Sequence, residues 1–300
     1  MEVVLQTKAV FQSADLRGVC DCHVHVIGPH EQYPLVPVRS YTPMHATATD
    51  LAAMMRRSGV DRAVVVQPSV LGLDNRCSLD ALEHLTSQGL EGRAVAVLPN
   101  ALPASALDDL HRAGVRGLRV NLQSNAGASL AQAREALQNA IQMCERHAWH
   151  VQLFVNRQMV QALSSDIENA PIEVVLDHFA GLSVSGCDDE SSLAVLRLLG
   201  SGNIHIKLSG NYRITDDAFD LRLADLARDL AGVNPEHLIW GSDWPHTPKH
   251  AGQTMNHPAV KPYRSVDTNR LSGVVFEWFE PPLAKRVLVE NPARLYDFSG

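Results

Sequence analysis

Residues 19–26 read VCDCHVHV, a short β-type run in which Asp21, His23 and His25 occupy alternate positions. Comparable runs, each bounded by turn residues, recur along the chain at intervals too long for hairpins. Helix-like stretches lie between most of them, and this alternation indicates parallel strands joined by helices. The predicted strands are 19–26, 61–67, 93–98, 115–122, 150–155, 172–178, 203–209 and 237–243.

The predicted helices carry sequence signals for their ends. Residues 49–58 follow a Thr-Asp start and end at Gly59, as the preferences of helix caps require. The long stretch 129–147 is amphipathic, so it should cover one face of the sheet. The other predicted helices are 104–113, 219–231 and 268–288.

Eight such units close naturally into a (β/α)8 barrel, the TIM-barrel fold of the α/β class. The rival is an open doubly wound sheet, but no GxGxxG follows the first strand and polar residues gather at strand ends. Loops 26–48 and 244–265 follow the first and eighth strands, so both should cover one corner of the barrel mouth. Because no linker divides the chain, we expect an N-terminal extension over 1–18 and one barrel domain over 19–300.

Composition excludes several classes of protein. The 300 residues are 45% hydrophobic, enough to bury a large core, and the net charge of −7 with 5% aromatics argues against a nucleic-acid partner. We find no 18-residue apolar run and no signal-peptide start, which predicts no membrane association. Five scattered cysteines predict a reduced, cytoplasmic protein.

The first predicted strand places two histidines on the same side. Side chains alternate along a strand, so His23 and His25 should both point into the barrel mouth, where paired imidazoles suit a metal or a substrate carbonyl. The plainer alternative is a chance pair of hydrogen-bonded histidines. Cys22, between them, is expected to face away from the barrel axis as a packed thiol.

Two later strands also end in polar residues. His178 follows the apolar run 174–176, and Asp243 lies in the stretch WGSDWPH. A carboxylate over the barrel axis can take a proton from water, as a general base must. The alternatives are a capped core histidine and a loop N-cap. The predicted catalytic set is His23, His25, His178 and Asp243.

These motifs resemble the amidohydrolase superfamily, and most closely the subgroup that contains 2-pyrone-4,6-dicarboxylate lactonase. The resemblance rests on DxHxH, DH and WGSDWPH at the ends of strands one, six and eight. It implies a hydrolase that opens a small carboxylated lactone, of the pyrone-dicarboxylate, sugar-acid or muconolactone type, by attack of water on the ring carbonyl. Further matching pieces are 27–29, 39–43, 67–69, 117–121, 208–213 and 291–296.

The resemblance also implies roles for single residues. Asp243 would deprotonate the attacking water, while the three histidines would polarise the lactone carbonyl. Arg119 and Arg213 would grip a substrate carboxylate, because a guanidinium group fits it in a two-pronged way; the alternative is a surface or intersubunit salt bridge. Additional hydrogen bonds to the substrate are expected from Tyr41, Ser69 and His246.

Two positions depart from the dicarboxylate lactonases. Asn125 stands where those enzymes carry a further Arg, and Phe154 stands where they carry a Tyr. The loss of a cation and a hydroxyl makes a second carboxylate on the substrate harder to hold, since an unpaired buried polar group costs about 1–3 kcal/mol. The substrate class is therefore better defined than the individual lactone.

A binuclear metal centre is not expected. Strand four ends with Arg119 and Asn121, and strand five with Phe154 and Asn156, so the additional ligands of such centres are missing. We expect a metal-free reaction, the alternative being one Zn²⁺ held by the four catalytic residues. Other functions on this scaffold are a metal-dependent decarboxylase, a lactone isomerase and a non-catalytic binding barrel. The expected partner is a small anionic lactone, and homo-oligomers are compatible with the sequence.

Overall fold

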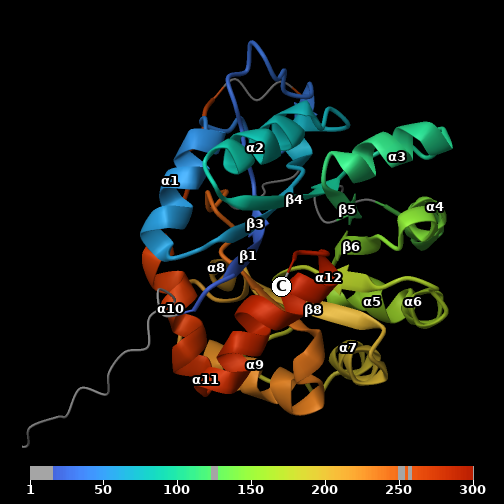
Figure 1. The fold of residues 1–300 in the computed structure, drawn as a ribbon. Helices are drawn as coiled ribbons and strands as arrows, with labels where there is room; N and C mark the ends of the chain where they lie inside the picture. Colours follow the sequence, from blue (N-terminus) through green and yellow to red (C-terminus); the bar gives the residue numbers. More distant parts are fainter. Residues whose placement is uncertain (1–15, 123–127, 249–253, 256–258, 300) are drawn as a thin grey trace, which may run out of the picture.

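The structure is a computed structural model that describes residues 16–122, 128–248, 254–255 and 259–299. Within these residues, eight parallel strands form one sheet in the order β1-β3-β4-β5-β6-β7-β8-β9, surrounded by helices (Figure 1). The strands are β1 (Cys20–Val24), β3 (Arg62–Val66), β4 (Glu91–Ala96), β5 (Val115–Asn121), β6 (His150–Phe154), β7 (Val174–Leu176), β8 (Ile204–Ser209) and β9 (Leu238–Gly241).

The sheet closes where its first and last strands meet. The backbone N–H of Asp243 donates to His23 O over 2.9 Å, and that of His25 donates to Trp244 O over 2.8 Å. These bonds join the end of β1 to the residues directly after β9, which confirms the predicted (β/α)8 barrel. The loops that follow β1 and β9 in the sequence also pair with each other, since β2 (Val38–Arg39) runs antiparallel to β10 (Thr254–Met255).

Helices cover the outside of the barrel. Gly59 ends α1 at a φ of 64°, which glycine adopts without steric cost. The predicted helix 268–288 is wrong in its length: α10 ends before Pro281 and Pro282, whose rings cannot continue it. No helix in the described ranges is long and apolar enough to cross a membrane. The longer helices are α1 (Ala48–Ser58), α2 (Arg76–Ser87), α3 (Ala104–Arg112), α4 (Leu130–Cys144), α7 (Glu190–Ser201), α9 (Arg222–Val233) and α10 (Thr268–Trp278).

The short helices and turns lie mostly in the segments that connect the strands to the longer helices. A π-type turn connects two short C-terminal helices, and a single 3₁₀ turn follows each of β3 and β7. The short elements are η2 (Ser69–Leu71), η3 (Glu145–His147), α5 (Arg157–Ala162), α6 (Ser164–Glu168), η4 (His178–Gly181), α8 (Asn211–Ile214), η5 (Pro235–His237), α11 (Pro281–Lys285), η6 (Arg286–Glu290) and α12 (Asn291–Leu295).

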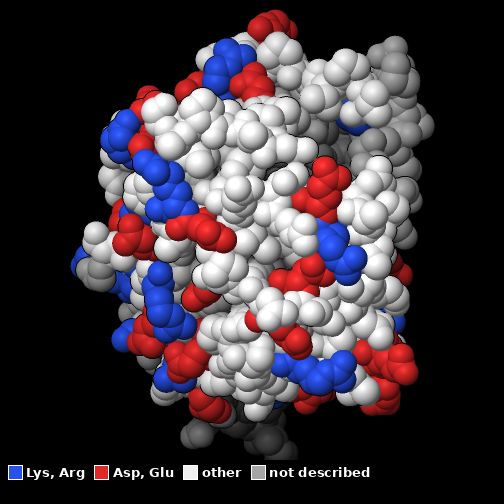
Figure 2. Space-filling model, turned by 90° about the vertical axis from the view of Figure 1, so that its right-hand side faces the viewer, with Lys and Arg blue, Asp and Glu red and all other residues white. Residues whose placement is uncertain are grey.

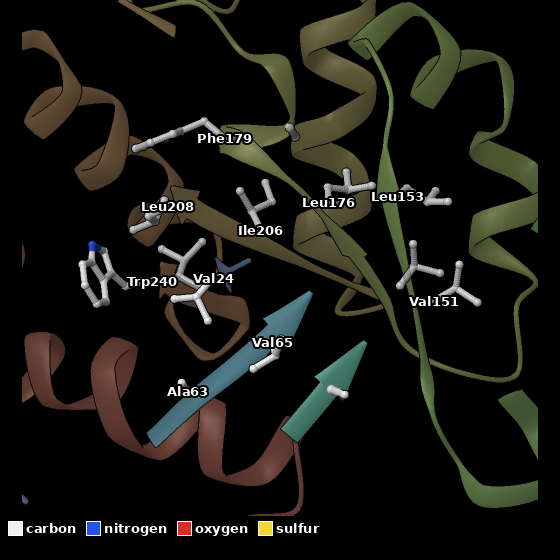
Figure 3. Packing of buried hydrophobic residues seen from close by; sticks show 14 of the residues in the cluster. Val24, Ala63, Val65, Val151, Leu153, Leu176, Phe179, Ile206, Leu208 and Trp240 are labelled. Carbon is white, nitrogen blue, oxygen red and sulfur yellow. The ribbon is translucent and has the colours of Figure 1, made fainter. Parts of the chain in front are cut away.

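Two hydrophobic layers follow from the alternation of side chains along the strands. Figure 3 shows part of the outer layer, where Val65, Leu153 and Ile206 pack in the large cluster shared with the helices. The opposite side chains, such as Val64 and Val175, form a smaller cluster in the barrel interior. The interior is therefore a packed core, and buried polar residues lie at both of its ends, with Asp243 at the mouth and His150 against Tyr296 at the start of the strands.

A β-bulge in β1 changes which side chains reach the interior. The pairing of β1 with β3 shifts between Asp21 and Val24, so an extra residue stands on the β1 side. The Asp21 carboxylate accepts from the N–H of His23 over 3.1 Å and from the N–H of Ser242 over 2.8 Å. The prediction that Cys22 faces away is wrong, because before the bulge Cys22 belongs to the interior cluster.

Charges of both signs are interspersed on the surface. Figure 2 shows one face on which Lys and Arg alternate with Asp and Glu over short distances, without a continuous basic stripe. This distribution agrees with the net charge of −7. A phosphate backbone would be bound by clustered cations, which this face does not offer.

Candidate active site

Asp243 lies at the centre of the mouth and is fully buried. Its backbone has a φ of 62°, a conformation that costs a non-glycine residue about 1–3 kcal/mol and is common at functional sites. Its Oδ2 accepts from Tyr212 OH over 2.7 Å and from Arg213 Nε over 2.6 Å. Its Oδ1 has no hydrogen-bond partner among the described residues and lies 3.7 Å from Nε2 of both His23 and His25. One oxygen is held in place and the other faces the histidines.

Two of the histidines are oriented by contacts at Nδ1. His25 Nδ1 lies 2.7 Å from Val66 O, which can only accept, so the proton of neutral His25 is on Nδ1. His178 Nδ1 lies 3.0 Å from Ser209 Oγ, a hydroxyl that can donate as well as accept. His178 is thus able to keep its proton on Nε2, whereas Nε2 of His25 is an acceptor.

His23 is oriented from below by a buried carboxylate. Its Nδ1 lies 3.3 Å from Asp177 Oδ1, which favours the tautomer with the proton on Nδ1. Gln152 Nε2 donates to both oxygens of Asp177 over 2.9 and 3.1 Å, and Lys207 Nζ donates to Gln152 Oε1 over 2.7 Å. Arg119 contacts the other oxygen of Asp177 at 3.5 Å. The floor of the site is therefore a closed polar network.

The protonation states follow from burial and from these charges. Burial lowers the pKa of all three histidines, that of His178 to about 3, so the rings are neutral at pH 7. Burial alone would raise the pKa of Asp243, but the Arg213 guanidinium and the neighbouring imidazoles hold it well below its usual range. Asp243 is therefore an ionised carboxylate beside neutral imidazoles.

A cavity of about 640 Å³, called the main cavity below, lies beside His178 and is large enough for a small ring acid. Asp243, His23 and His25 are not among the described residues in its wall. Phe154, His178, Tyr212 and Arg213 lie in its wall, and so does Asp177. A separate recess of about 180 Å³ lies next to it and is lined by Gln67, Ser69, Gly72, Leu73, Val97, Arg119 and Asn121.

The donor atoms at the mouth also fit a single divalent cation. One ligand atom each from His23, His178 and Asp243 lies within 4.8 Å of the other two. Neither ring nitrogen of His23 makes a well-aligned hydrogen bond within the described part of the chain, and the same holds for Asp243 Oδ1. Two imidazoles and one carboxylate are a common set of Zn²⁺ ligands. His25, which the sequence also suggested, is not a member of this group.

The family model for amidohydrolases matches residues 20–298. The chain belongs to the amidohydrolase family. A 4-sulfomuconolactone hydrolase of Rhizobium radiobacter is 30% identical, with 93% of this chain and 90% of the relative covered. A 2-pyrone-4,6-dicarboxylate hydrolase of Comamonas testosteroni is 29% identical (93% and 90% covered), and a D-galactarolactone isomerase of Agrobacterium fabrum is 25% identical (94% and 92% covered).

A solved structure from Pseudomonas putida, named as a candidate 2-pyrone-4,6-dicarboxylic acid hydrolase, has a TM-score of 0.75 at 27% identity, covering 95% of this chain and 100% of that one. The expected resemblance to this subgroup is thus confirmed, as is the enzyme class, a hydrolase of the amidohydrolase family.

Both predicted substrate-binding arginines of this amidohydrolase are paired inside the site. Arg213 bonds Asp243 and also donates to Thr247 Oγ1 over 2.6 Å. Arg119 donates to Gln67 O over 3.1 Å and contacts Asp177. The alternative of surface salt bridges is therefore wrong for both arginines, while contact with a substrate stays a prediction.

The remaining predicted contacts lie at different depths. Tyr41 is buried, and burial raises its pKa to about 12, so it is a neutral hydrogen-bonding group. Ser69 lines the small recess beside Arg119. His246 does not line the main cavity among the described residues: its Nε2 lies 2.7 Å from Thr268 Oγ1, and its N–H donates to Asp243 O over 2.8 Å. Its contact with a substrate stays a prediction.

Of the two positions that depart from the lactonase pattern, the structure describes only Phe154. Asn125 lies outside the described residues. Phe154 is in the cavity wall, with its ring centroid 4.9 Å from that of His178 in an edge-to-face contact and 5.6 Å from the Arg119 guanidinium. The ring supplies a flat apolar surface where a Tyr would add a hydroxyl.

Sequence reasoning missed three residues that position the predicted catalytic groups. Tyr212 precedes Arg213 in a motif already noted, and Asp177 precedes His178, so both stood next to predicted residues. Lys207 is the only cation in the apolar strand IHIKLS, which is a signal for a buried charge with a partner. Its partners, Gln152 and the carbonyl of Cys22, come from other strands.

Proposed function

We propose that this amidohydrolase opens a small carboxylated lactone by attack of water on the ring carbonyl, with Asp243 as general base. The observation that carries the proposal is the divided carboxylate: Oδ2 is bound by Tyr212 and Arg213, while ionised, unpartnered Oδ1 faces the histidines. The names of its relatives, lactone hydrolases and a lactone isomerase, support the same substrate class.

The tautomers assign different tasks to the three histidines. Nε2 of His23 and of His25 are acceptors 3.7 Å from Asp243 Oδ1, so together they can hold a water that gives one hydrogen to the carboxylate and one to an imidazole. The water oxygen then keeps a lone pair free for the lactone carbonyl. His178 can donate from Nε2 and so stabilise the oxyanion that forms.

The proton that Asp243 takes from water is returned to the ring oxygen when the C–O bond breaks. The products are a hydroxyl and a carboxylic acid on one open chain, and the acid then loses its proton to solvent and becomes a carboxylate. Arg213 and Tyr212 keep Oδ2 occupied, so the proton is received and released at Oδ1.

The proposed reaction needs no metal, and the charge balance supports this. Arg119, Lys207 and Arg213 lie next to Asp177 and Asp243, so cationic side chains already compensate these two carboxylates. A cation bound by His23, His178 and Asp243 would require the other His178 tautomer, and it would supply a Lewis acid and a water of lowered pKa.

The test is turnover of a lactone panel in H₂¹⁸O. The panel contains 2-pyrone-4,6-dicarboxylate, 4-sulfomuconolactone, muconolactone and aldonic lactones. We expect ring opening with one ¹⁸O atom in the new carboxylate of the product. The second candidate, a lactone isomerase, is favoured by the galactarolactone relative and predicts an isomeric product without ¹⁸O. No reaction with any lactone would contradict both.

A further inference from the structure

One arginine in the main cavity is not neutralised. Four guanidinium groups line this cavity, and three of them have a carboxylate oxygen within 3.5 Å. Arg264 has no carboxylate within ion-pair distance in the part of the chain that the structure describes. The neutralised pairs are Arg157–Asp189, Arg213–Asp243 and Arg222–Asp220.

The Arg264 side chain is nevertheless held in a defined place. Its guanidinium carbon lies 4.9 Å from the centroid of the Tyr212 ring, a cation–π contact, and its backbone N–H donates to His246 O over 2.8 Å. Its Nε is buried without a hydrogen-bond partner among the described residues. A buried donor without an acceptor costs free energy, and a bound anionic oxygen would satisfy it.

Arg264 is also close to the reacting centre. The Tyr212 ring that it covers donates from its hydroxyl to Asp243 Oδ2 over 2.7 Å, so a single aromatic ring separates the guanidinium from the general base. Arg264 precedes α10 and lines the same cavity as His178 and Tyr212.

We propose that Arg264 binds a second anionic group of the substrate, a carboxylate or a sulfonate. The substrate is then a dianion, and its second acidic group lies at Arg264. This inference rests on the proposed function for the lactone ring, but the anion site itself can be measured without turnover.

The test is calorimetric binding of three unreactive aromatic acids: benzoate, isophthalate and 3-sulfobenzoate. They share one ring, and only the last two carry a second anionic group. We expect the parent protein to bind both dianions at least tenfold more tightly than benzoate. Arg264→Gln should remove most of this preference and leave benzoate affinity within about twofold, and Arg264→Lys should restore part of it.

Arg222→Gln is the matched control, because Arg222 lines the same cavity but is paired with Asp220. It should keep the preference for dianions. The proposal is overturned if the parent protein shows no such preference, if Arg264→Gln weakens benzoate and isophthalate equally, or if Arg222→Gln has the same effect. Comparison of the two dianions tells which anionic group is preferred.

Lactone hydrolysis by the parent protein, measured alongside, separates the two proposals. Ring opening without a dianion preference overturns the role of Arg264 and leaves the proposed function intact. A dianion preference that depends on Arg264, without any ring opening, supports the role of Arg264 and overturns the proposed function.

Discussion

Arg213 Nε donates to Asp243 Oδ2 over 2.6 Å, while Oδ1 of the same carboxylate has no hydrogen-bond partner in the described ranges. The salt bridge performs two functions at once. Its charge keeps Asp243 ionised in a buried site, and its position leaves only one oxygen to accept a proton. Arg213 therefore determines both that Asp243 is ionised and which of its two oxygens can act as the base.

Replacement of the base is the most direct test of this arrangement. Asp243→Asn keeps the size of the side chain but cannot accept a proton from water, so kcat should fall by about 10²–10⁴-fold, the usual contribution of a general base. Binding of isophthalate should stay detectable in a calorimeter, because the cavity walls are unchanged. A variant with kcat close to that of the parent protein would show that Asp243 is not the base.

The salt bridge predicts a specific change in the pH profile. Arg213 lowers the pKa of Asp243 and burial lowers that of His178 to about 3, so neither group should reduce the parent activity in mildly acidic buffer. In Arg213→Gln the pKa of Asp243 should rise, and the acid limb of kcat/KM should move to higher pH because the carboxylate becomes protonated earlier. Equal acid limbs in the two proteins would contradict this coupling. A general loss of structure would lower the rate without moving the limb.

The network under His23 should be a large source of stability. Asp177→Asn removes the negative charge next to the buried cations Lys207 and Arg119. Breaking a buried ion pair in this way lowers the free energy of unfolding by about 3–5 kcal/mol. Asp188→Asn, at an exposed position, is the control and should change the free energy of unfolding by less than about 0.5 kcal/mol. Urea unfolding measures both, and equal midpoints for the two variants would contradict the role of the network.

Buried neutral histidines predict acid sensitivity. Burial lowers the pKa to about 3 for His150 and His178 and to about 4 for His246. The unfolded chain therefore binds more protons than the folded one between pH 6.5 and about 4, so the free energy of unfolding falls as the pH falls through this range. Asp21, whose pKa burial raises to about 6, offsets a part of it, because its protonation favours the folded state.

His150 lies apart from the catalytic group and isolates this effect. In His150→Gln the slope of the unfolding free energy between pH 6 and 4.5 should decrease by about 1.4 kcal/mol per pH unit, the equivalent of one proton. Ser87→Ala, at an exposed position of α2, removes no titrating group and should keep the parent slope. An unchanged slope in the first variant would mean that His150 is protonated in the folded state.

Removal of metal tests whether the reaction proceeds without a divalent cation. We expect protein purified without added zinc, and dialysed against a chelator, to keep its lactone hydrolysis and to contain far less than one equivalent of metal. The reason is that three cationic side chains already compensate the two carboxylates of the site. Activity lost on chelation and regained with one equivalent of Zn²⁺ would show that His23, His178 and Asp243 hold a catalytic cation.

The sequence by itself determined the barrel and predicted a catalytic set at its mouth. Strand periodicity and helix caps are local signals, since each depends on neighbours within a few residues. Polar residues directly after apolar strands identified His23, His25, His178 and Asp243, because parallel strands bring all their carboxyl ends to one mouth.

Tertiary structure decided how these groups are used. Lys207 and Cys22 are 185 positions apart, and the hydrogen bond from Ser242 to Asp21 joins residues 221 positions apart. No local sequence pattern encodes contacts between residues so far apart. The sequence around Arg264 likewise gives no sign that this arginine lacks a carboxylate partner. Which arginine is neutralised and which oxygen of Asp243 stays free depend on distances between strands and loops, and these arise only when the barrel closes.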